Sequence, residues 1–168
     1  MKRNKFVIAI FALIFCLPLL SDAQQFKLAT KPVLTLEVVK AVASKASEYA
    51  MQNKFVVVIS IVDDGGHLLY LERMDGVQTG SIEVAIQKAK TAAAFKRKSK
   101  AFLDALKTGR PELVALPGGI PFDGGVPLIW NDQVIGAIGV SGMTTGEQDG
   151  MIAEFASNSL AEMLKKLN

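Results

Sequence analysis

The chain has 168 residues, of which 50% are apolar and 21% are charged, and its formal net charge is +3. This length and apolar content predict one domain with a real core, which excludes wholesale disorder. Cys16 is the only cysteine, so a scaffold held together by disulfides is excluded as well.

Residues 1–23 have the pattern of a secretory signal peptide. Three basic residues precede an apolar run over 6–20, and small residues lead to Ala23. The run is shorter than the roughly 20 apolar residues that a membrane span needs. We therefore expect cleavage after Ala23; a retained N-terminal anchor is the alternative. A lipoprotein is disfavoured because bulky Phe15 precedes Cys16.

Export would leave a nearly neutral protein with no membrane span. Removing residues 1–23 leaves a net charge of +1 and no cysteine. A nucleic-acid-binding domain is usually strongly basic, so we expect no nucleic-acid partner. We expect a periplasmic or extracellular protein with a polar leader over 24–33 and one domain over 34–168.

The first half of the domain predicts a helix followed by a hairpin. Thr35 is a suitable N-cap, and apolar residues then recur every three or four positions as far as Asn53. Residues 55–62 are almost continuously apolar and β-branched, which indicates a strand buried on both faces. The turn at 63–66 contains two glycines, and a return strand follows over 67–73.

Two helices and a turn-rich segment come next. Ser81 can cap a helix over 82–95, whose predicted inner face consists of small residues. A shorter helix is expected over 99–107, after a run of basic residues. Residues 109–125 are rich in glycine and proline, which predicts a long irregular connection.

A second hairpin and a final helix complete the domain. Pro127 predicts that the strand over 126–130 lies at an edge, because proline cannot donate to a ladder. Two glycines inside the strand over 133–141 indicate close backbone approach. A helix follows over about 147–167. Hairpins joined through helices predict an α/β fold with an antiparallel sheet and helices packed on it.

The sequence carries no standard catalytic motif. His67 is the only histidine, and it could act as an axial haem ligand or as a proton carrier. The alternative is a half-exposed hairpin residue without a function. Asp63 and Asp64 lie nearby, but their spacing is that of a hairpin turn rather than a multidentate metal cage.

A basic stretch and a glycine-rich loop are the other candidate binding segments. Residues 88–110 contain eight basic residues and one acidic residue, Asp104, so they could pair with an anionic ligand. A solvated helix face is the alternative. The glycines at 118–119 and 124–125 could form an anion-binding nest, or a long turn.

Several motifs follow one another in order along the chain. They are Val-Asp-Asp-Gly-Gly-His-Leu at 62–68, Glu-Arg-Met-Asp-Gly at 72–76, Lys-Ala-Lys-Thr-Ala at 88–92, Leu-Pro-Gly at 116–118, Gly-Gly-Val-Pro-Leu at 124–128, Gly-Ala-Ile-Gly-Val-Ser-Gly at 136–142 and Glu-Gln-Asp at 147–149. With these motifs the chain resembles the GlcG/HbpS-like haem-binding (haem-degrading domain) family over about residues 34–164.

The resemblance implies a fold, an assembly and a class of ligand. It implies a profilin-like α/β sandwich with a five-stranded antiparallel sheet flanked by helices, and homo-oligomers from dimers to octamers. Exported members of this family bind haem, and some are described as degrading haem or sensing redox stress. Others occur in glycolate or diol-utilisation operons without a settled activity.

The resemblance also suggests where haem would bind. In an exported relative the haem contact follows the Lys-Ala-x-Thr motif and involves a threonine, and the matching position here lies near Ser99. We expect non-covalent haem with His67 as the iron ligand, or with the Ser99 hydroxyl region at the axial position instead; catalytic residues stay unassigned. The expected haem-binding residues are His67, Lys88, Thr91, Phe95, Lys96 and Ser99.

Three functional hypotheses remain open, and whether the protein is an enzyme stays undecided. The first is an exported haem-binding protein in haem handling or redox sensing, with the porphyrin against Phe95 or Phe102 and its propionates near the cations of 96–100. The second is an enzyme or binding protein for a small anionic metabolite. The third is an oligomeric assembly domain without a small ligand.

The second hypothesis has its own set of residues. Asp63 or Asp75 would be the general base, and Arg73 or Lys88 would hold a carboxylate. It requires that the fold bring these side chains together in one pocket.

Overall fold

A computed structural model of the protein describes residues 26–165, and the predicted signal peptide lies outside them. The chain divides into two units, Met1–Thr30 and Lys31–Asn168. In the first unit, the described residues 26–30 are exposed and irregular. All described helices and strands belong to the second unit. Within 26–165, no helix is both long and apolar enough to span a membrane.

The order of helices and hairpins agrees with the predicted order, apart from an added 3₁₀ helix, η1. Strand β1 starts three residues later than predicted, since Phe55 to Val57 lead into it. The elements are α2 (Leu36–Gln52), β1 (Val58–Asp63), β2 (Leu68–Arg73), α3 (Ser81–Phe95), α4 (Lys100–Lys107), η1 (Pro111–Ala115), β3 (Gly125–Trp130), β4 (Gln133–Ser141) and α5 (Gly146–Lys165).

The sheet in the described residues is antiparallel and has four strands in the order β2-β1-β4-β3. The expectation of five strands was therefore wrong. The two hairpins supply two strands each and join where β1 pairs with β4, with Val58 opposite Ser141 and Asp63 opposite Gly136. Strand β3 lies at an edge, as Pro127 predicted.

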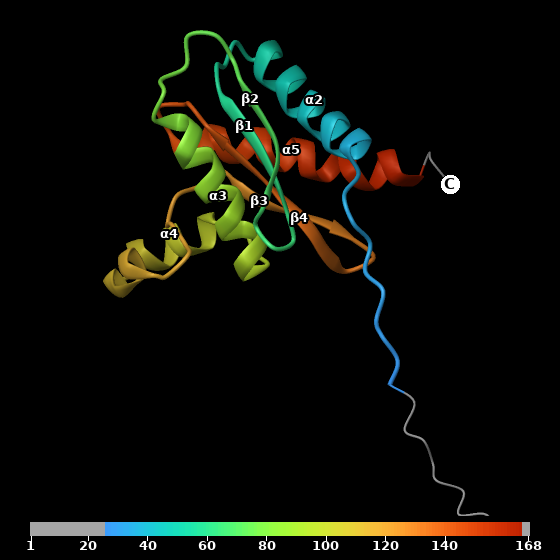
Figure 1. Ribbon diagram of the computed structural model, residues 1–168. Coiled ribbons are helices and arrows are strands. Elements are labelled where there is room, and N and C mark those ends of the chain that lie inside the picture. Colours follow the sequence, from blue (N-terminus) through green and yellow to red (C-terminus); the bar gives the residue numbers. More distant parts are fainter. Residues whose placement is uncertain (1–25, 166–168) are drawn as a thin grey trace, which may run out of the picture. The chain divides into compact units, whose positions relative to one another are not determined.

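Helices cover both faces of the sheet. Helix α3 packs against β1, β3 and β4, whereas α2 and α5 pack together on the other face (Figure 1). Strand β1 lies inside the sheet, so its successive side chains point to opposite faces and pack in different cores. Ile59 and Ile61 belong to the large core with α2 and α5, while Val62 packs with alanines of α3. This position explains the continuous apolar run of β1.

Close packing of α3 on the sheet depends on small residues. A Cβ at Gly139 in β4 would overlap the carbonyl oxygen of Ala85 and lie 3.0 Å from Cβ of Ala89. Both alanines are fully buried. The glycine prediction for β4 is therefore confirmed at this position, and α3 can lie directly on the strand.

The two predicted N-caps have different outcomes. Thr35 caps α2, since its hydroxyl accepts a hydrogen bond from Val38 N at 3.4 Å. The predicted cap at Ser81 was wrong, because α3 begins at Ser81 and Gly80 occupies the N-cap position without a side-chain bond. Ser81 is instead buried, with 3% of its surface exposed.

Candidate functional site

The hairpin turn between β1 and β2 presents the imidazole of His67 to solvent. The side chain is 83% exposed, and its Nδ1 lies 3.1 Å from Oδ2 of Asp63. Asp63 Oδ1 also accepts hydrogen bonds from the backbone N–H groups of Gly65 and His67, at 2.9 and 2.8 Å. Partial burial opposes ionisation, but these bonds outweigh it and lower the pKa of Asp63. A charged, anchored carboxylate therefore orients the ring.

The turn lies beside α3. A Cβ on Gly66 would be 3.6 Å from Cγ of Lys90, which is an ordinary van der Waals distance and places the turn close to this helix. Gly66 also has φ of +83°, which glycine adopts at little cost. His67 and Lys90 therefore belong to one region of the surface, although they are distant in sequence.

The C-terminal end of α3 carries aromatic and basic side chains together. The rings of Phe95 and Phe102 meet edge to face with centroids 5.0 Å apart, and Arg97 lies 5.6 Å from the Phe102 centroid. Lys96 follows the helix in a left-handed conformation and is exposed. Phe102 is buried and Phe95 is half-buried, so Phe95 and the cations are the accessible part of this surface.

Lys88 is buried, with 2% of its surface exposed. Its Nζ donates to Asp149 Oδ2 at 2.8 Å and to the carbonyl oxygen of Val140 at 2.9 Å. Asp149 Oδ1 accepts from Met143 N at 3.1 Å. Burial raises the pKa of Asp149, and Lys88 opposes that rise. The pair thus joins α3, β4 and α5 in the interior.

Thr91 and Ser99 are also completely buried. The Thr91 hydroxyl donates to Gln87 O at 2.7 Å and accepts from Ile120 N at 3.0 Å. Ser99 Oγ accepts from Gly125 N at 2.9 Å. The Thr91 hydroxyl therefore bonds to the backbone of the loop before β3, and the Ser99 hydroxyl bonds to the first residue of β3. Of the six expected haem-binding residues, His67, Phe95 and Lys96 are the accessible ones.

Sequence reasoning missed Asp123, which precedes β3 and is 6% exposed. Its Oδ1 accepts a hydrogen bond from Gly124 N at 2.7 Å. Burial raises the pKa of Asp123 and outweighs the opposing effects of that bond and of Lys100 and Lys88. The available signal was an aspartate followed by two glycines, in a segment whose sequence predicts an anion-binding nest or a long turn.

The residues of the metabolite hypothesis are not all brought together. Arg73 and Asp75 line a surface pocket of about 630 Å³ with Glu72 and residues of α2 and the loop after it. Asp63 lies at the opposite end of the hairpin, about 16 Å along the strands from Arg73. Lys88 is a buried residue of α3 that pairs with Asp149 in the interior. This set therefore cannot form one pocket.

The comparisons with known proteins identify the family. A model of the family described as "Haem degrading protein HbpS-like" matches residues 34–158. The chain belongs to the HbpS-like family. Protein GlcG of Escherichia coli K12 is 38% identical to this HbpS-like chain over 112 residues, which cover 67% of this chain and 84% of GlcG.

Two solved structures support this assignment. A double mutant of Streptomyces reticuli HbpS is 29% identical, with a TM-score of 0.74, and the match covers 82% of this chain and 94% of that one. PduOC, crystallised as a haem complex, is 31% identical with a TM-score of 0.68, over 76% and 95% of the two chains. The HbpS-like chain thus shares its fold with one relative whose structure contains haem.

Proposed function

We propose that this HbpS-like protein binds haem non-covalently, with His67 as the iron ligand. The family and the haem complex of PduOC support haem as the ligand. The metal-binding side chains of this chain are consistent with haem as the ligand. Among residues 26–165 no three His, Cys, Asp or Glu side chains group as ligands for a free metal ion. Haem iron needs only one or two protein ligands, because the porphyrin supplies the others.

The pairing of Asp63 with His67 is the observation that carries the proposal. A histidine that binds a metal commonly donates its other ring N–H to a carboxylate, which selects the tautomer and orients the ring. Nδ1 of His67 faces Asp63 at 3.1 Å, and no described residue hydrogen-bonds to Nε2. The exposed Nε2 is then the donor available to iron.

The surface around His67 offers groups that suit a porphyrin. Leu68 and Leu69 are 47% and 38% exposed on the adjoining edge strand. Lys90 lies beside the turn, and Lys96 is exposed at the end of α3. Propionates are carboxylates, which lysines bind by charge-assisted hydrogen bonds. Bound haem would supply a redox-active iron, so haem handling or redox sensing is the role we propose.

We also propose that the protein is exported and that it assembles into homo-oligomers. The signal-like pattern of residues 1–23 supports export. N-terminal sequencing of the protein secreted by its host would begin at Gln24 if cleavage occurs after Ala23. Sedimentation velocity of that product would give a mass above that of one chain; a monomer at all concentrations would contradict assembly.

A haemin titration of residues 24–168, which include the entire compact unit, tests the function. We expect saturable binding and a shifted Soret band. His67→Ala should lose that band, because it removes the only imidazole. Asp64→Asn is the matched control, since it changes only an exposed ion pair with Lys31 in the same turn. No saturable shift with the wild-type protein would exclude haem, and an unchanged band in His67→Ala would exclude His67.

Asp63→Asn tests the orienting role separately. Asparagine retains the oxygen that accepts from Gly65 and His67 but loses the negative charge facing Nδ1. We expect haemin affinity to fall about 10- to 100-fold, the usual cost of losing such a carboxylate partner. The haemin dissociation constant measures this change, and equal affinities of wild type and Asp63→Asn would contradict the orienting role.

A further inference from the structure

The pocket beside Arg73 lies at the end of the β1-β2 hairpin opposite the His67 turn, where the C-terminal end of α2 meets the end of β2. Its volume is about 630 Å³, which is within the usual range for pockets that hold small ligands. Such pockets combine apolar walls with a few polar groups that orient the ligand. The apolar lining residues here are Met51, Phe55, Val56 and Met74.

The apolar wall of this pocket is accessible. Met51 and Val56 are 63% and 47% exposed. Phe55 and Met74 pack against the large core and also line the pocket. Methionine side chains are flexible and polarisable, so they adapt to apolar groups of different shape. The wall therefore favours a ligand with an apolar part.

Opposite charges line the same pocket without neutralising each other. Arg73 ends β2, Asp75 follows two positions later, and both residues are exposed. Neither forms an ion pair with a residue among 26–165. Arg73 Nη2 donates to Val77 O at 2.7 Å, which anchors the guanidinium and leaves its Nε and Nη1 groups without a partner in the described chain. A ligand with both a carboxylate and an ammonium group would pair with the two side chains at once.

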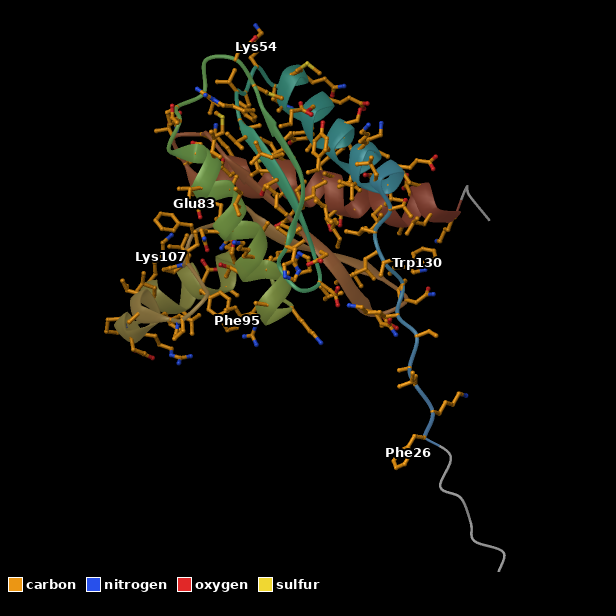
Figure 2. The ribbon with its side chains drawn as sticks, in the orientation of Figure 1. Phe26, Lys54, Glu83, Phe95, Lys107 and Trp130 are labelled. Carbon is orange, nitrogen blue, oxygen red and sulfur yellow. The ribbon has the colours of Figure 1, made fainter. Side chains whose placement is uncertain are left out.

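A second acid and a second base make the pocket electrically neutral. Glu72 is held by hydroxyl donors, since Ser47 Oγ donates to its Oε1 and Tyr70 to its Oε2. A carboxylate accepts about four hydrogen bonds, so Glu72 can still accept one from a ligand. Lys54 follows α2, and its side chain extends outward at the rim (Figure 2). The two acids disfavour a dianion such as phosphate, and they equally oppose the two propionates of haem.

We propose that this pocket binds an α-amino acid with an apolar side chain. Arg73 binds its carboxylate, and Asp75 and Glu72 accept from its ammonium group. Met51 and Val56 cover its side chain. A zwitterion matches both signs of charge in the pocket, whereas a simple carboxylate or a simple amine matches only one. The pocket is separate from the His67 turn, so the inference does not rest on haem binding.

L-Leucine is a suitable probe, and NMR on ¹⁵N-labelled residues 24–168 follows its binding. We expect saturable shifts of the Val56, Arg73 and Asp75 amides. Two analogues of leucine each lack one charge: 4-methylpentanoate has no ammonium group, and 3-methylbutylamine has no carboxylate. Each should bind several-fold more weakly than leucine. Glycine, which lacks the apolar side chain, should also bind several-fold more weakly.

Two exposed substitutions test the same contacts. Asp75→Asn keeps the size of the side chain but removes its charge, and it should weaken leucine binding about two- to fivefold, as expected for an exposed ion pair. Asp132→Asn, in the turn between β3 and β4, is its matched control. Met51→Ser should weaken binding several-fold because apolar contact is lost. Leu36→Ser is its control, since Leu36 is 60% exposed at the other end of the same helix.

Three results with leucine would overturn the proposal. They are the absence of saturable shifts at the pocket, equal binding of leucine and either analogue, and equal affinities of wild type and Asp75→Asn. Amide dispersion verifies that each variant is folded. Met51→Ser should leave the haemin Soret shift unchanged; loss of that shift would place haem in this pocket and would contradict the proposal as well.

Discussion

At the scale of residues, two carboxylates show how the surroundings decide a role. Asp63 is partly exposed and bonded by three groups of its own turn, so it stays ionised and orients His67. Asp149 is 3% exposed and has Lys88 as its charged partner. The first carboxylate faces a side chain in solvent, and the second stabilises an interior lysine. Of the two carboxylates, only that of Asp63 is exposed enough to take part in a binding site at the surface.

The buried pair predicts a large effect from a small change. Asp149→Asn keeps the shape and the oxygen that accepts from Met143 N, but it leaves the Lys88 charge without compensation. Loss of one partner of a buried pair costs about 3–5 kcal/mol, and we expect that decrease in the free energy of unfolding. Urea denaturation measures it. Lys88→Met combined with Asp149→Leu should recover most of the loss; a double variant as unstable as the single one would contradict this explanation.

At the scale of elements, the close contact of α3 with β4 explains why both elements carry small residues where they meet. Ala85 and Ala89 lie over Gly139, so helix and strand approach at backbone distance. The same helix also bears Lys88, which reaches Asp149, and its C-terminal end carries Phe95. Displacement of α3 would therefore disturb the core and the candidate haem surface together.

Gly139→Ala should destabilise the protein by more than the about 1–3 kcal/mol typical of overpacking, because the added methyl meets backbone that cannot move away. Gly80→Ala is the matched control, since its Cβ would meet nothing within 4 Å and its φ is −59°. We expect the control to change stability by less than about 1 kcal/mol. Thermal and urea unfolding of the two variants would give the comparison, and similar losses in both would contradict the packing argument.

At the scale of the whole molecule, the chain consists of a compact unit from Lys31 onwards and a separate N-terminal unit. The compact unit contains the core, the His67 turn and the pocket beside Arg73. Its first residue, Lys31, pairs with Asp64 in the turn at 2.7 Å. The residues that carry the proposed haem site therefore belong to this one unit.

Chains that start at residue 24 and at residue 31 should accordingly have the same stability. The described part of the residues that differ, 26–30, contains no helix or strand. We expect equal urea midpoints and equal m-values, because the surface exposed on unfolding is nearly unchanged. A lower midpoint for the shorter chain would show that residues 24–30 stabilise the domain.

Local patterns in the sequence determined the elements. Continuous β-branched residues identified β1, a double glycine identified the hairpin, and Pro127 identified an edge strand, since these features act over a few residues. The resemblance of ordered motifs gave the family, and the family model confirmed it. The strand number was wrong because it came from the resemblance and no segment of this chain had been assigned to a fifth strand.

Only the tertiary structure decided which polar residues are accessible. Lys88, Thr91 and Ser99 occupy binding-like positions in the sequence but are buried and bonded inside, whereas His67 is exposed. Asp123 was missed because the elements that bury it, α4 and α5, come from either side of it in the chain. Burial and charge pairing depend on contacts between such distant segments, and a local pattern does not contain them.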